Sequence, residues 1–74
     1  MKYYAIQDRD TGLFISSTDF TRIKPRQILS SPLRPPILFT GGELTRELKR
    51  RHIKLKYYKV VVVEVEKMKE EPGT

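Results

Sequence analysis

Four prolines break up the middle third of this chain, at Pro25, Pro32, Pro35 and Pro36. Proline lacks a backbone N–H donor and disfavours helix at the residue before it. We therefore expect an irregular but ordered connection over residues 18–40. It carries eight large apolar residues as anchors: Phe20, Ile23, Ile28, Leu29, Leu33, Ile37, Leu38 and Phe39. Because connections longer than about 12–15 residues are uncommon unless functional, this segment is a candidate interaction loop.

The segment before the proline-rich connection has the pattern of a β-hairpin. Residues 2–8 and 13–17 are strand-like, and the loop between them ends in Gly12. Glycine readily adopts the left-handed conformation that a short hairpin loop needs. Side chains alternate along a strand, so the hairpin should have two distinct faces. We expect one face to carry Tyr4, Ile6 and Phe14, and the other Tyr3, Ala5, Leu13 and Ile15.

The segment after the proline-rich connection begins with residues that are typical of a helix N-terminus. Thr40 is a capping residue and Glu43 follows three positions later, which together form a capping box. We expect a helix from there to about His52, with Leu44 and Leu48 as its buried stripe. The basic side chains of this helix should lie away from that stripe.

The last strand is expected over residues 53–66. Ile53, Leu55, Tyr57, Val61, Val63 and Val65 alternate with a second face that carries Lys54, Lys56, Tyr58, Val60, Val62, Glu64 and Glu66. The run from Val60 to Val63 is apolar on both faces, which is typical of a strand covered on both sides.

These elements predict an α+β fold of the order β-β-loop-α-β. One antiparallel or mixed three-stranded sheet would pack on one helix, in a single domain over residues 1–67 followed by a flexible tail over 68–74. The chain has 74 residues and no cysteine. Its core must be small, and disulfides cannot reinforce it.

One helix covers only one face of such a sheet. The other face would expose apolar residues, among them a candidate homodimer face of Tyr3, Ile15, Val60 and Val62. Exposed apolar surface of this kind usually marks an interface. Either the proline-rich segment folds over it or a second subunit does, and the sequence leaves both alternatives open.

The positive charge is concentrated in one short segment. Residues 46–59 hold seven Lys or Arg and one acid, which equals the whole net charge of +6. Such a patch attracts polyanions, either nucleic acid or an acidic protein groove. The alternative is a solvated surface with a lysine-protected edge strand. The candidate partner- or nucleic-acid-binding residues are Arg46, Lys49, Arg50, Lys54, Lys56 and Tyr58.

Catalytic and metal-binding patterns are weak. His52 is the single histidine, and no nucleophile with an evident base partner accompanies it. Residues 8–12 resemble the start of a calcium loop, but Gly12 is at the fifth position and Asp19 occupies the twelfth, where the motif needs glycine sixth and glutamate twelfth. We therefore expect no enzymatic activity, no catalytic residues, no cofactor and no bound metal.

Targeting signals are also missing from the pattern. The N-terminus turns polar at Gln7 and acidic at Asp8, so it has no apolar signal region. No stretch approaches the roughly 18 apolar residues of a membrane helix. We expect a cytoplasmic protein without membrane contact.

Several segments together resemble a known group of proteins: residues 3–8, 10–16, 36–40, 43–51 and 58–66. They are similar to segments of small accessory proteins from phages and prophages of Gram-positive bacteria. Such small phage proteins include inhibitors of host machinery, among them anti-CRISPR proteins that block guide-RNA nucleases. The resemblance implies a location in the host cytoplasm and a host protein or ribonucleoprotein as partner.

Three hypotheses follow. The first is a non-enzymatic phage accessory protein that binds and inhibits a host enzyme or ribonucleoprotein, most specifically a single-effector guide-RNA nuclease. The second is a small basic module that binds DNA or RNA through phosphates without base specificity. The third is a structural homodimer whose basic face is only solvated.

Overall fold

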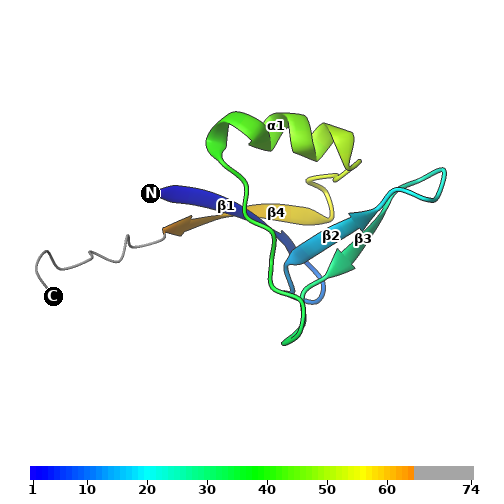
Figure 1. Ribbon diagram of the computed structural model, residues 1–74, viewed down its shortest axis with the longest axis horizontal. Coiled ribbons are helices and arrows are strands. Elements are labelled where there is room, and N and C mark those ends of the chain that lie inside the picture. Colours follow the sequence, from blue (N-terminus) through cyan, green and yellow to red (C-terminus); the bar gives the residue numbers. More distant parts are fainter. Residues whose placement is uncertain (65–74) are drawn as a thin grey trace, which may run out of the picture.

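The computed structural model describes residues 1–64, and its coarse class is α+β as predicted. Four strands and one helix follow in the order β1 (Lys2–Asp8), β2 (Ile15–Asp19), β3 (Arg26–Leu29), α1 (Gly41–Arg50) and β4 (Tyr58–Glu64). Figure 1 shows α1 lying along one side of β1 and β4, with β2 and β3 extending as a hairpin beside the C-terminal end of the helix. The expected tail over 68–74 and the expected domain end at 67 lie outside the described residues.

The prediction of one three-stranded sheet is wrong. β1 pairs antiparallel with β4 along its whole length, from Lys2 opposite Glu64 to Asp8 opposite Tyr58. β2 pairs with β3 instead, in a second two-stranded sheet. The expected hairpin between β1 and β2 is reduced to one isolated bridge between Gln7 and Phe14. Beyond that bridge β2 turns away from β1, because β3 supplies its backbone partners.

The strand β3 lies inside the segment expected to be irregular. It occupies four of the six residues between Pro25 and the next proline, Pro32, where backbone N–H donors are uninterrupted. Its pairing with β2 runs from Ile15 opposite Leu29 to Asp19 opposite Arg26, with a register shift after Ile15. The proline rule therefore limited the length of this strand without preventing it.

The last strand starts five residues later than predicted. The backbone N–H groups of Tyr57 and Tyr58 both donate to the carbonyl of Lys54, at 3.0 and 3.1 Å. This turn occupies residues 54–57, so Lys54 and Lys56 do not share a strand face with Tyr58. Alternation of apolar and polar residues was misleading here, because Ile53 is buried at the end of the helix and not in a strand.

The helix begins as its capping box predicts. Thr40 is the N-cap, its backbone N–H donates to Oε1 of Glu43 at 2.8 Å, and its carbonyl accepts the N–H of Leu44 at 3.1 Å. The helix ends at Arg50, slightly before the expected His52. Within the described residues no helix is both long and apolar enough to cross a membrane.

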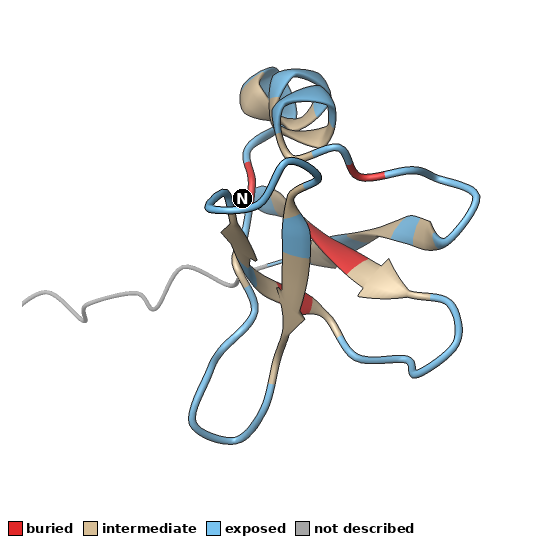
Figure 2. Cartoon of the chain, turned by 90° about the vertical axis from the view of Figure 1, so that its right-hand side faces the viewer, coloured by how far each residue is buried: buried red, intermediate tan, exposed pale blue. Residues whose placement is uncertain are grey.

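One small core joins both sheets to the helix. Its buried members are Ile6, Ile15, Phe39 and Ile53, and partly buried residues pack around them: Leu29, Ile37, Leu44, Leu48 and Tyr58. Phe39 is tied to β1 by two backbone hydrogen bonds with Tyr4, each 2.8 Å. In Figure 2 the buried positions are few and most of the surface of the helix is partly or fully exposed. The proline-rich segment thus contributes to the core.

The residues of the expected homodimer face do not share a surface. Ile15 is completely buried in the core. Tyr3 lies opposite Val63, whereas Val62 lies opposite Tyr4 and Val60 opposite Ile6. Directly opposed residues point to the same side of a sheet. Tyr3 is therefore on the face away from Val60 and Val62, and only those two valines of the set lie together.

Candidate nucleic-acid interface

A concave site lies between the start of β3 and the connection from α1 to β4. It has a volume of about 300 Å³. Its lining residues are Lys24, Pro25, His52, Lys54, Tyr57 and Tyr58. We call this site the basic pocket. It brings together a residue of the proline-rich segment and residues that are almost thirty positions further along the chain.

The chemistry of the basic pocket is that of an anion receptor with aromatic walls. Two ammonium groups and an imidazole are available as donors, and no carboxylate belongs to the lining. Burial, and to a smaller extent the charge of Asp8, raises the pKa of Tyr58 above its ordinary value of 10.0. The phenol of Tyr58 is therefore neutral at physiological pH and can donate a hydrogen bond. Tyr57 is 54% exposed and the ammonium of Lys56 lies over its ring, so the ring offers accessible surface for stacking beside a positive charge.

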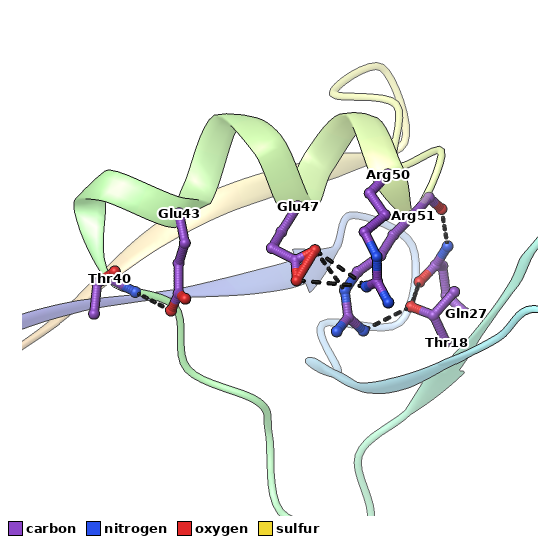
Figure 3. A network of polar contacts seen from close by, with 7 residues as sticks. All are labelled: Thr18, Gln27, Thr40, Glu43, Glu47, Arg50 and Arg51. Atoms are coloured by element: carbon purple, nitrogen blue, oxygen red, sulfur yellow. Dashed lines mark hydrogen bonds and ion pairs between the residues drawn. The ribbon is translucent and has the colours of Figure 1, made fainter.

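A polar network holds the two walls of the pocket in place (Figure 3). Arg51 donates from Nη1 to Oγ1 of Thr18 at 3.0 Å, and Thr18 donates to Oε1 of Gln27 at 2.6 Å. Gln27 closes the ring by donating from Nε2 to the carbonyl of Arg51 at 2.7 Å. These contacts connect the end of α1 to both β2 and β3. They hold β3, which follows Lys24 and Pro25, against the end of α1, which precedes His52 and Lys54.

Arg51 is a structural residue, which its place in a run of basic residues did not reveal. Its guanidinium carbon lies 5.3 Å from the ring centre of Phe39 and 5.9 Å from that of Phe20. Its Nε lies 3.7 Å from Oε2 of Glu47. Aromatic stacking and an ion pair favour arginine over lysine at such a position. Arg51 is therefore largely covered, with 11% of its side chain exposed, and adds little to the exposed charge.

His52 ends the helix in an unusual conformation. Its φ is 53°, in the left-handed region that glycine normally occupies at this position. The N–H of Ile53 donates to the carbonyl of Leu48 at 2.9 Å, and the N–H of His52 donates to the carbonyl of Lys49 at 3.2 Å. These two bonds define a Schellman motif. The motif turns the chain sharply after α1 and brings His52 to the wall of the pocket.

The structure divides the predicted basic residues into two groups. Lys54 and Tyr58 line the basic pocket, and the ammonium of Lys56 lies 5.5 Å from the ring centre of Tyr57. Arg46, Lys49 and Arg50 are exposed on α1 and do not line it. Arg50 also contacts two other side chains. Its Nη1 lies 3.2 Å from Oε2 of Glu47, and its guanidinium carbon lies 4.7 Å from the ring centre of Phe20.

Sequence reasoning did not find Lys24. It lies outside the basic segment, in a stretch selected only for its prolines and apolar anchors. No local spacing relates Lys24 to Lys54, because only the second sheet brings β3 to the end of α1. His52 was considered as a catalytic or metal-binding residue and set aside, but not as part of an anion site.

The face of the β1–β4 sheet away from α1 has a groove that is lined by apolar residues. It has a volume of about 320 Å³ and is lined by Ala5, Phe14, Pro35, Pro36, Leu38 and Val63. We call this site the apolar groove. The proline-rich segment covers this face only partly, because it forms one wall of the groove and leaves the groove open. Coverage by this segment and coverage by a second subunit are therefore compatible.

Among residues 1–64, no three His, Cys, Asp or Glu side chains lie close enough together to hold a metal ion. Comparisons of this chain with protein-family models, with curated proteins and with solved structures found no match.

Proposed function

We propose that this protein is a non-enzymatic binding protein whose basic pocket engages single-stranded nucleic acid. One observation carries the proposal: Lys24, His52 and Lys54 share a concave site with Tyr57 and Tyr58, without an acidic lining residue. Lysine ammonium groups that contact phosphates, next to an exposed aromatic side chain on which a base can stack, are the two components of single-strand binding. A duplex offers no unpaired base, so Tyr57 would be unused there.

The proposed affinity is mainly electrostatic and sequence-tolerant. Lysine acts as a point charge towards phosphate, and no base-reading signature accompanies these residues. Further exposed Lys and Arg side chains outside the pocket lie on the β2–β3 turn, on α1 and in the turn before β4: Arg22, Arg46, Lys49 and Lys56. Releasing counterions from several phosphates makes binding depend steeply on salt.

The test is binding of fluorescently labelled single-stranded RNA, single-stranded DNA and duplex DNA at two salt concentrations. The informative variant is the double change Lys24→Glu with Lys54→Glu. The control is Lys2→Glu with Arg34→Glu, which alters net charge equally at two exposed residues outside the pocket. We expect the pocket variant to lose single-strand binding at least about tenfold more than the control.

Equal losses in the two double variants would show that only net charge matters and would reject the pocket as the site. A Tyr57→Ala variant separates stacking from charge, since stacking contributes about 1–3 kcal/mol per base. If Tyr57→Ala leaves the affinity unchanged and duplex DNA binds as well as single strands, the single-strand proposal fails.

A second proposal keeps the phage inhibitor hypothesis and names a host ribonucleoprotein as partner, with a guide-RNA nuclease as the most specific case. The observation that favours it is the apolar groove on the opposite side of the sheet from α1. A ribonucleoprotein offers RNA to the basic pocket and apolar protein surface to the groove. Purified guide-RNA nuclease assayed with and without this protein tests the idea, and unchanged cleavage at saturating concentration rejects it for that enzyme.

A further inference from the structure

The outer edge of β4 carries backbone groups that β1 does not use. The N–H and carbonyl of Tyr4 both bond to Phe39, on the side of β1 away from β4. Tyr4 and the opposing Val62 are therefore a pair without mutual hydrogen bonds. Bonding alternates along an antiparallel strand, so the backbone groups of Val60, Val62 and Glu64 face outwards. In the described part of the chain, β1 is the one strand that pairs with β4.

This edge lacks the usual protection against pairing. Edge strands are normally blunted by proline, a bulge or inward charges. The centre of β4 is instead four consecutive valines, with Lys59 and Glu64 only at its ends. Val62 is 57% exposed. Within the described residues no strand covers this edge, and the exposed side chain of Val62 lies near its centre.

We infer that the outer edge of β4 is a homodimer interface, in which β4 of one copy pairs antiparallel with β4 of a second copy. The outward-facing residues are symmetric about Val62. Placing Val62 opposite Val62 of the second copy sets Val60 opposite Glu64 in both directions. Each such pair exchanges two hydrogen bonds, so these three pairs satisfy all the outward groups of residues 60, 62 and 64.

The same register pairs the valines on both faces of the joined sheet. Val62 packs against its own copy on the side of α1, and Val61 packs against Val63 on the side of the apolar groove. The contact uses the same β4 edge of both copies, so no β4 edge is left unpaired once two copies have joined. Pairing through β4 therefore stops at two copies.

Tyr58 explains why this register is preferred over one centred on Val61. That alternative sets Tyr58 opposite Glu64, and the N–H of Tyr58 already donates to the carbonyl of Lys54 at 3.1 Å. A register centred on Val62 needs no donor that is in use. It also leaves the turn at residues 54–57 beyond the paired core of the interface.

Sedimentation equilibrium of the full chain tests the inference, with Val62→Pro as the informative variant. Proline removes the N–H of residue 62, which faces outwards, and leaves the β1 hydrogen bonds in place, because proline is tolerated on strand edges. Val62→Thr is the matched control, since threonine keeps the N–H and the β-branched shape. We expect dimers for the wild type and for Val62→Thr, and monomers for Val62→Pro.

A wild-type monomer at every attainable concentration would overturn the inference, as would a dimer that survives in Val62→Pro. If circular dichroism shows that Val62→Pro fails to fold, Val62→Glu replaces it. This exposed substitution sets two carboxylates opposite each other at the dimer axis, and a dimer that persists in it would equally reject the β4 edge. Amide exchange gives a second measurement: protection at Val60 and Val62 must rise with protein concentration.

Discussion

At the scale of single residues, His52 is where local conformation and the basic pocket meet. Its φ of 53° is a conformation that costs a non-glycine residue roughly 1–2 kcal/mol. The Schellman hydrogen bonds and the burial of Ile53 keep it there. Strained backbone of this kind is often retained where a side chain has a role. The imidazole lies in the wall of the pocket, where the proposed function would give it such a role.

The change His52→Gly should raise the free energy of unfolding by about 0.5–1 kcal/mol, because glycine adopts positive φ without strain. Urea denaturation measures the difference. His52→Ala is the control, since it also removes the imidazole but retains the Cβ, and it should bring no such gain. Both variants should weaken single-strand binding equally. A glycine variant no more stable than the alanine variant would contradict the strain.

At the scale of elements, the β2–β3 hairpin is the part that carries Lys24 to the pocket. Asp19 ends β2 and organises the turn: its Oδ1 accepts the hydroxyl of Thr21 at 2.6 Å and the N–H of Thr21 at 2.9 Å. The side-chain hydrogen bond from Thr21, followed by the backbone one, lowers the pKa of Asp19 below its ordinary value of 3.8. The folded turn therefore favours the ionised carboxylate.

The pH dependence of this turn follows from that direction. Because the folded pKa is depressed, the contribution of Asp19 is complete above pH 3.8 and is lost as the pH falls through the lower, folded value. The amide NMR signal of Thr21 should titrate with a midpoint below 3.8, and this transition should vanish in Asp19→Asn. A midpoint at or above 3.8 would show that the hydrogen bonds to Thr21 do not form in solution.

At the scale of the whole molecule, the dimer and the basic pocket have a joint consequence. Tyr58 lies four residues from the proposed axis at Val62 in each copy. At about 3.3 Å per residue, the two pockets would be about 26 Å apart along the joined strands. A nucleic acid long enough to reach both would bind with avidity, whereas a short one would not.

This bivalency predicts that Val62→Pro weakens binding of a long single strand at least about tenfold and leaves binding of a short oligonucleotide unchanged. Fluorescence anisotropy with two lengths of the same repeated sequence measures it, and Val62→Thr serves as the control. Equal losses for both lengths would mean that the variant damages the pocket itself. No loss for either length would mean that the two pockets act independently.

Several elements could be predicted because their causes are local. The capping box of Thr40 and Glu43 depends on residues three apart, and the strand β1 and the turn at Gly12 follow from alternation and from one glycine. The strand β3 was missed because a four-residue strand in a short stretch between prolines carries little pattern of its own. The predicted start of the last strand at Ile53 was wrong. An apolar residue that is buried just after a helix fits the apolar–polar alternation as well as one in a strand does.

The sequence by itself determined the α+β class, the position and capping of the helix, and the concentration of positive charge in residues 46–59. Only the tertiary structure decided that β2 pairs with β3, that Arg51 is largely covered, and that Lys24 joins Lys54 and the tyrosines in one pocket. The reason is physical. Capping and charge depend on neighbours along the chain, whereas strand partners and pocket walls depend on which distant backbone groups satisfy one another when the core closes.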